Sequence, residues 1–261
     1  MGRNRGVAGA AEATVIAQYL SGIGIAIYAL VRFPQVRSIG SLRFLRRDRI
    51  REIISFSTLT CIQQSVMNLG ILMVQGLVNS FGPGVMAAFA AAVKIDAFAY
   101  MPVQDFGNAF STFIAQNYGA KEGARIRTGL KGAVCISLAF CAVISALVCA
   151  FAKPLMAIFV DAGEAEVIAE GVRYLRIEGV FYCGIGCLFL LYGLYRALGR
   201  PGMSVVLTVI SLGTRVALAY LLSSIPAMGV TGIWWSVPIG WGLADLAGLL
   251  YYKARKEELL A

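Results

Sequence analysis

The stretch LKGAVCISLAFCAVISALVCAF, residues 130–151, holds one charged side chain, Lys131, and is otherwise made of apolar and small residues. A helix of roughly 20 apolar residues crosses the roughly 30 Å hydrocarbon core of a bilayer. The composition of the chain agrees, since 59% of its 261 residues are hydrophobic and 14% are charged, against about a quarter in soluble domains. The stretch therefore predicts one span of a polytopic membrane protein.

Six further apolar segments on either side of this stretch are long enough to span. Two of them, 84–118 and 168–195, carry internal charges. The predicted fold is an all-α polytopic membrane protein with about seven transmembrane helices. The predicted spans are 7–31, 53–80, 84–118, 130–151, 168–195, 202–223 and 230–252.

Basic residues gather in alternate connections between these spans. Sixteen Lys or Arg lie in or beside the connections at 32–51, 121–131, 196–200 and 253–256, and the opposite connections hold three, at positions 3, 5 and 153. Connections rich in Lys and Arg stay in the cytoplasm. The pattern predicts a bacterial cytoplasmic (inner) membrane protein with its C-terminus inside, and it explains the net charge of +9 without a nucleic-acid partner.

Residues suited to metal binding or enzymatic catalysis are scarce. The chain has no histidine, and its six cysteines form no CxxC pair. A zinc site of thiol and imidazole ligands therefore has almost no material. Neither a GxxxxGK[ST] phosphate loop nor a GxSxG elbow occurs. We expect no catalytic residues, no metal and no cofactor.

The first and last predicted spans resemble each other. Residues 6–28 and 229–251 both begin GVxG and end in tyrosine, and basic residues follow both. This echo predicts a repeat unit of six helices, of which the chain holds one copy plus the last helix of another. The predicted domains are a last N-terminal-lobe helix (1–31), a basic cytoplasmic loop (32–52), a six-helix C-terminal lobe (53–252) and a cytoplasmic tail (253–261).

The second predicted span carries a polar stripe. At 100° per residue its polar side chains fall on one face, and such groups are costly against lipid. They are expected to form hydrogen bonds between helices or to line a water-filled cavity. The stripe comprises Ser57, Gln64, Asn68, Gln75 and Asn79, of which Gln64, Asn68 and Gln75 are candidate substrate-binding residues.

The third span contains KIDAFAYMPVQDF, residues 94–106, where charged residues and Pro102 interrupt an apolar segment. Proline favours a bend at that point, and an ionisable residue at membrane depth indicates a functional site. Solvation at the membrane surface is the alternative for Lys94 and Asp96. The candidate cavity residues here are Lys94, Asp96, Gln104, Asp105 and Asn108.

Later spans carry three more ionisable residues. Glu178 follows Arg173 and Arg176, either of which is a possible structural partner, and Asp245 lies one turn after Trp241. Arg215 is a partner for either acid. We treat Glu178, Arg215 and Asp245 as secondary candidates.

Three segments resemble the C-terminal half of the multidrug and toxic compound extrusion (MATE) family. They are residues 76–126, which include QNYGA at 116–120, YRALGRPG at 195–202 and GVTGIWWSVPIGW at 229–241. The resemblance implies two pseudo-symmetric lobes with twelve helices in all, and export of organic, often cationic, compounds or drugs in exchange for Na⁺ or H⁺. It also implies that the remainder of the N-terminal lobe is missing from this sequence.

The sequence departs from one branch of that family, which uses acids in its seventh and tenth helices for cation coupling. The corresponding spans offer Gln63, Gln64 and Asn68, and then residues 184–195, without an acid at matching depth. The pattern is closer to the DinF-like branch, whose important aspartate lies in the first helix of the N-terminal lobe. The family's best-known coupling site therefore transfers to no position here.

The resemblance makes efflux transport the first hypothesis, with lipid as the surroundings. Protonation or cation binding at Asp105 or Asp96 would then compete with a cationic substrate. A lipid-linked oligosaccharide flippase is the alternative within the same superfamily, with Lys94 and Arg215 as its candidate pyrophosphate contacts. A non-functional fragment is a further alternative. A retinal protein is disfavoured because residues 230–252 contain no lysine.

Overall fold

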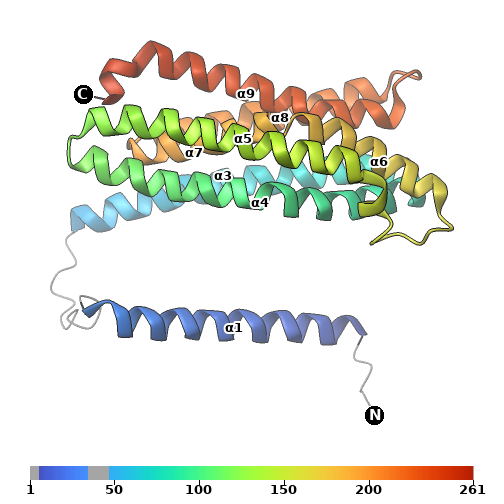
Figure 1. The fold of residues 1–261 in the computed structure, drawn as a ribbon, viewed down its shortest axis with the longest axis horizontal. Helices are drawn as coiled ribbons and strands as arrows, with labels where there is room; N and C mark the ends of the chain where they lie inside the picture. Colours follow the sequence, from blue (N-terminus) through green and yellow to red (C-terminus); the bar gives the residue numbers. More distant parts are fainter. Residues whose placement is uncertain (1–5, 35–46, 261) are drawn as a thin grey trace. The chain divides into compact units, whose positions relative to one another are not determined.

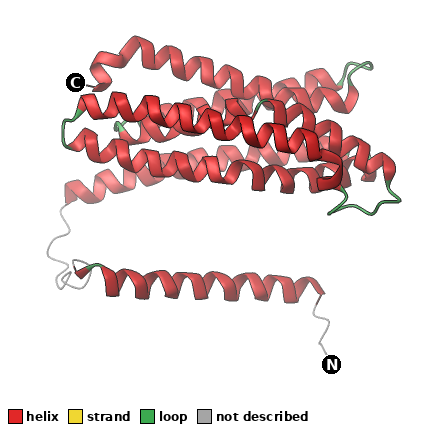
Figure 2. Ribbon diagram, viewed as in Figure 1, coloured by secondary structure: helices red, strands yellow, loops and turns green. Residues whose placement is uncertain are grey.

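A computed structural model describes residues 6–34 and 47–260, and the regular secondary structure of these residues is entirely helical (Figures 1 and 2). The predicted all-α class is confirmed. The helices are α1 (Gly6–Arg32), α3 (Arg47–Asn79), α4 (Pro83–Gly119), α5 (Gly123–Met156), α6 (Ala165–Val180), α7 (Tyr182–Ala197), α8 (Pro201–Ser223) and α9 (Gly229–Leu260).

Six of these helices contain a segment long and apolar enough to cross a membrane, and α6 and α7 together supply a seventh. Each predicted span falls on one helix or on the α6–α7 pair. The prediction of about seven spans is therefore confirmed. The six segments are Ala11–Arg32, Ile53–Asn79, Pro83–Gly119, Gly123–Met156, Pro201–Ser223 and Gly229–Arg255.

The chain divides into two compact units, Met1–Ile54 and Ser55–Ala261. The first contains α1, whose apolar side chains are exposed within that unit. The second is a bundle in which α4 packs against α5, α6 and α7, while α9 packs against α6, α7 and α8. Most of the predicted basic loop, residues 35–46, lies outside the described residues. The predicted domain boundaries remain predictions.

Helix α7 lies inside the bundle, and small residues let it approach α4 closely. A Cβ added to Gly193 would lie 2.6 Å from the carbonyl oxygen of Gly107, and one added to Gly107 would lie 3.0 Å from that of Phe189. Helices in membranes associate through such close contacts of small residues. Because α4 and α7 are held this tightly, the side chains on the inner face of α4 have fixed neighbours.

The fifth predicted span is bent, where the sequence suggested one segment over 168–195. Helices α6 and α7 meet at 54° around Phe181, whose backbone angles of φ −104° and ψ 15° lie outside the helical range. The Phe181 N–H donates to the carbonyl of Glu178, three residues back, and the Gly184 N–H donates to Phe181. These tightened bonds end one helix and start the next.

The bend expected at Pro102 does not interrupt α4, which runs through that residue from Pro83 to Gly119. Helix α5 is the one that kinks. Phe151 adopts φ −101° and ψ 15°, three residues before Pro154. A proline removes the bond to the carbonyl four residues back and distorts the preceding turn. Pro154 therefore follows a residue with non-helical backbone angles, whereas α4 continues as one helix through Pro102.

Candidate functional site

Two carboxyl groups come together inside the bundle, Asp96 from α4 and Glu178 from α6. Their side chains are 3% and 1% exposed, and each interacts electrostatically with the other. Asp96 therefore lies in the protein interior, and the alternative of a solvated residue at the membrane surface is wrong for it. Two adjacent buried acids are costly unless positive charge or hydrogen-bond donors compensate them.

Tyrosine hydroxyl groups bind both oxygens of Asp96. Tyr174 from α6 donates to Oδ2 at 3.2 Å, and Tyr182 from the start of α7 donates to Oδ1. The break at Phe181 lies between Tyr174 and Tyr182, so the bent span presents one donor from each of its halves. The phenols hold the Asp96 carboxyl in place and satisfy part of its hydrogen-bonding capacity.

Glu178 is less completely compensated. It interacts with Asp96, Tyr174 and Arg215, the last from α8. Its Oε1 is buried without a hydrogen-bond partner in the described part of the chain, and so is Nε of Arg215. Arg215 is thus close enough to act on Glu178 through its charge, but the two side chains form no direct ion pair in the described structure. The expected structural pairing with Arg173 is not found, because Arg173 binds Glu170 at 3.0 Å.

We call Asp96, Glu178, Tyr174, Tyr182 and Arg215 the acidic centre. Its two carboxylates outnumber its one guanidinium, so the fully ionised centre carries a net negative charge in an apolar interior. A proton or a small cation would neutralise that charge, and the unpartnered Oε1 is an available oxygen. The arrangement is chemically suited to binding and releasing one positive charge.

An aromatic cluster lies next to the acidic centre. Phe89 and Trp234 stack with centroids 5.5 Å apart and planes 9° from parallel, and Tyr174 meets Trp234 edge-on at 4.9 Å. The indole Nε1 of Trp234 donates to Oε1 of Glu170 at 2.7 Å. The cluster therefore connects Tyr174 of the acidic centre with Glu170, one helical turn earlier on α6.

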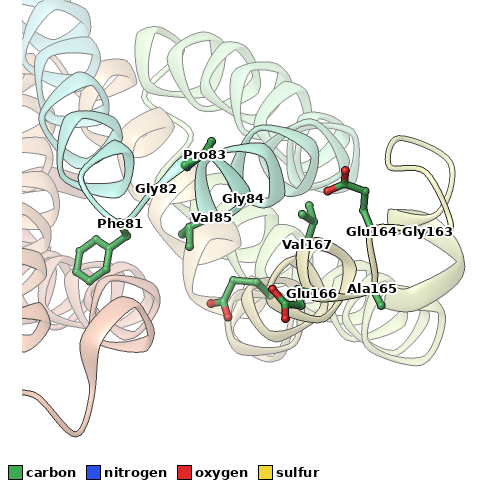
Figure 3. A pocket seen from close by; sticks show the side chains of 11 residues that line it. Phe81, Gly82, Pro83, Gly84, Val85, Gly163, Glu164, Ala165, Glu166 and Val167 are labelled. Atoms are coloured by element: carbon green, nitrogen blue, oxygen red, sulfur yellow. The ribbon is translucent and has the colours of Figure 1, made fainter.

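Glu170 also lines a pocket of about 750 Å³ at the end of the bundle (Figure 3). The turn between α3 and α4 forms one side of this pocket and the start of α6 forms the other, with three glutamates among the lining residues. The pocket is lined by Phe81, Gly82, Pro83, Gly84, Val85, Gly163, Glu164, Ala165, Glu166, Val167 and Glu170.

Asp245 belongs to a separate place on α9. Its Oδ1 is buried and lacks a hydrogen-bond partner among the described residues. A Cβ added to Gly184 on α7 would lie 3.6 Å from Oδ2, so the carboxyl faces the first turn after the break. Of the two acids for which Arg215 was a possible partner, its charge acts on Glu178.

The other predicted cavity residues do not join the acidic centre. Lys94 and Asp105 are exposed on α4, and Asn108 is exposed and accepts a hydrogen bond from Nη2 of Arg196 at 3.1 Å. In the second predicted span, Gln64 and Asn68 are exposed and Gln75 is half-buried, as is Gln104 on α4. None of these groups is fully buried, and their role in a cavity stays a prediction.

Four aromatic residues at or beside the acidic centre were not identified from the sequence. They are Phe89, Tyr174, Tyr182 and Trp234. One signal was available, because Glu170, Tyr174 and Glu178 are spaced by four residues and so share a face of α6. Tyr182 lies beyond the break, where that helical periodicity no longer applies, and Trp234 comes from a distant segment.

The family model MatE matches residues 59–221. The chain is 28% identical to the probable multidrug resistance protein YpnP of Bacillus subtilis over 95% of this chain and 55% of the relative. It is 22% identical to the probable multidrug resistance protein NorM of Thermotoga maritima, over 88% and 49%. The chain therefore spans about half the length of these curated relatives.

Solved structures share the fold over almost the whole chain. A MOP-superfamily transporter of Pyrococcus furiosus superposes with a TM-score of 0.86 at 22% identity, covering 98% of this chain and 58% of that one. The Vibrio cholerae MATE transporter VcmN, solved as a mutant, gives 0.84 at 25% identity, over 98% and 58%.

Proposed function

The chain belongs to the MatE family, and we propose that it forms the C-terminal lobe, with one preceding helix, of a two-lobe secondary transporter that exports organic compounds in exchange for Na⁺ or H⁺. The coverage of 55% of YpnP and 58% of the Pyrococcus furiosus transporter supports the assignment to one half. The curated relatives are probable multidrug resistance proteins, which favours drugs and other small organic compounds as substrates.

The observation that carries this proposal is the acidic centre at a broken span. Transporters place coupling-ion sites where discontinuous helices expose polar groups near the middle of the membrane. Here Glu178 lies three residues before the break and Tyr182 directly after it, and both face Asp96 from α4. The coupling ion neutralises the one net negative charge of the acidic centre, and its release restores that charge.

Exchange follows from charge competition. With the ion bound, the acidic centre is neutral and α6, α7 and α4 pack together without uncompensated charge. When the ion leaves, the negative charge favours a cationic substrate or a rearrangement that readmits water. Alternating access requires that the ion-bound and ion-free protein favour different conformations, and this change of charge provides that difference.

Efflux of a fluorescent organic cation from cells tests the proposal in the two-lobe protein that carries this chain. Asp96→Asn and Glu178→Gln each remove a charge, and we expect each to reduce efflux about tenfold or more. Asp161→Asn, a carboxyl exposed in the connection between α5 and α6, is the matched control. Collapsing the Na⁺ gradient or the proton gradient separately identifies the ion. Unchanged efflux in both variants would refute the proposal.

The flippase alternative gains less support from the geometry. Its two candidate pyrophosphate contacts do not converge, because Lys94 is exposed on α4 whereas Arg215 interacts with Glu178 in the interior. A pyrophosphate would also meet the two acids beside Arg215. Flipping of labelled lipid in vesicles by the wild type, with no dye efflux, would favour the flippase instead.

Membership of the DinF-like branch and a cytoplasmic C-terminus complete the proposal. The branch is supported by residues 53–79 of α3, which offer amides and no acid. The orientation is supported by the sixteen basic residues in alternate connections. A C-terminal reporter that fluoresces only in the cytoplasm checks the orientation. An aspartate in the first helix of the preceding lobe whose amide variant still exports dye would contradict the branch.

A further inference from the structure

The pocket at the end of the bundle and the acidic centre lie on one line of side chains. On α4, Val85 lines the pocket, and Phe89, Ala92 and Asp96 follow at spacings of four, three and four residues. Such spacings place residues on a single helical face. The inner face of α4 therefore runs from the pocket to the carboxyl of Asp96.

Helix α6 presents a parallel line on the opposite side. Glu170 lines the pocket, Tyr174 comes one turn later and Glu178 one turn after that. Tyr174 links the two lines, because its ring packs edge-on against Phe89 at 5.7 Å and its hydroxyl donates a hydrogen bond to Asp96. The space between the pocket and the acidic centre is thus bounded by α4 and α6.

Three aromatic rings close that space. The exposed fractions of Phe89, Tyr174 and Trp234 are 5%, 2% and 1%. Ala92, which lies between Phe89 and Asp96 on α4, is fully buried. Trp234, from α9, contacts both other rings. In this arrangement water and ions in the pocket have no open route to Asp96.

We propose that the pocket is the external vestibule through which the coupling cation reaches the acidic centre, and that Phe89, Tyr174 and Trp234 form its gate, latched by Glu170. The pocket is a passage in this proposal rather than a binding site. The identity of what passes rests on the proposed function. The existence of the gate does not.

Glu170 is suited to act as the latch. One of its oxygens accepts from Nε1 of Trp234 at 2.7 Å and the other accepts from Nη1 of Arg173 at 3.0 Å. Its side chain is 18% exposed, and that of Arg173 is 56% exposed. A cation in the vestibule competes with both donors for the Glu170 carboxylate. Hydrogen bonds to a charged acceptor are stronger than neutral ones, so the ionised Glu170 holds Trp234 firmly. A cation that shares the carboxylate weakens this bond and loosens Trp234.

Thiol labelling of Ala92→Cys tests the gate. A membrane-impermeant thiol reagent is added to intact cells, and the parent without this cysteine gives the background from the six native cysteines. We expect slow labelling when the gate is intact. Adding Phe89→Ala should raise the labelling rate about tenfold, because removal of one ring increases the population of an open minor state. Phe98→Ala, at a ring 74% exposed on the same helix, is the matched control.

Equal labelling rates in the Phe89→Ala and Phe98→Ala backgrounds would overturn the proposal, as would labelling that occurs only in inverted membranes. Trp234→Phe is a second, milder variant, for the case in which Phe89→Ala does not fold. It keeps an aromatic ring and removes the donor to Glu170. We expect it to raise labelling several-fold, and Glu170→Gln to raise it less. No change in either variant would refute the latch.

The labelling result is independent of transport. If Asp96→Asn leaves efflux intact while Phe89→Ala accelerates labelling, the gate stands and the proposed coupling role fails. If Asp96→Asn abolishes efflux while the labelling rate of Ala92→Cys is unchanged in every gate variant, the coupling role stands and the gate fails.

Discussion

The two polar regions of α4 carry similar residues and have opposite surroundings. Asp96 is 3% exposed and is bound by two tyrosines, whereas Asp105, nine positions later, is exposed. Nine residues turn an α-helix by two and a half turns, so the two carboxyls point to opposite sides. The neighbours on each side decide the difference. Asp96 faces α6 and α7, and Asp105 faces away from the bundle.

This comparison assigns the two faces of α4 different tasks within our proposal. The buried face holds a charge whose binding and release are controlled by the bundle itself. The exposed face, with Asp105 and Gln104, is available to groups that come from outside the bundle. Variants that remove one polar group at a time test whether the two faces of α4 have different roles.

The largest effect is expected from Arg215→Met, which removes the guanidinium that interacts with Glu178. Breaking a direct buried ion pair costs about 3–5 kcal/mol, and this is the upper limit here because Arg215 is half-buried and acts on the acids only through its charge. Thermal unfolding of the purified chain in detergent should therefore shift strongly downward. Lys94→Met removes an exposed cation from α4 and is the control. An unchanged unfolding temperature for Arg215→Met would mean that the acid pair is already neutral without it.

A moderate effect is expected from Tyr182→Phe, which removes one donor to Asp96 and keeps the ring. A hydrogen bond to a charged group contributes about 1.5–3 kcal/mol, and loss of this one should also weaken the affinity for the coupling ion. Unfolding in detergent and the ion dependence of efflux measure the two consequences. Tyr220→Phe, at a tyrosine 48% exposed on α8, is the control. Equal behaviour of the two variants would exclude Tyr182 from the acidic centre.

The fold class and the number of spans could be predicted because they depend on local composition. Residues 130–151 identify a span without reference to any other helix. The break at Phe181 could not be predicted, since no proline lies between Glu178 and Gly184. It depends on backbone hydrogen bonds three residues apart around Phe181. A proline does not by itself determine where a helix is interrupted, because α4 continues through Pro102 whereas Phe151, before Pro154, has non-helical backbone angles.

The candidate site was predictable only in part, for a related reason. The sequence identified Asp96 as an ionisable candidate at membrane depth, but a single helix cannot show what lies opposite that side chain. The partners of Asp96 come from positions 174 and 182, on two other helices that pack against α4. Such tertiary contacts leave no signature in the sequence of α4 alone.

The smallest effect on stability is expected from Asp105→Asn. The side chain is exposed, and substitutions at exposed sites usually change stability by less than about 0.5 kcal/mol. In the two-lobe protein, however, we expect the KM for a cationic dye to rise several-fold with little change in kcat, because an exposed carboxylate attracts the substrate without taking part in ion release. A fall in kcat with unchanged KM would instead place Asp105 with Asp96 in the coupling step, and the division between the two faces of α4 would be wrong.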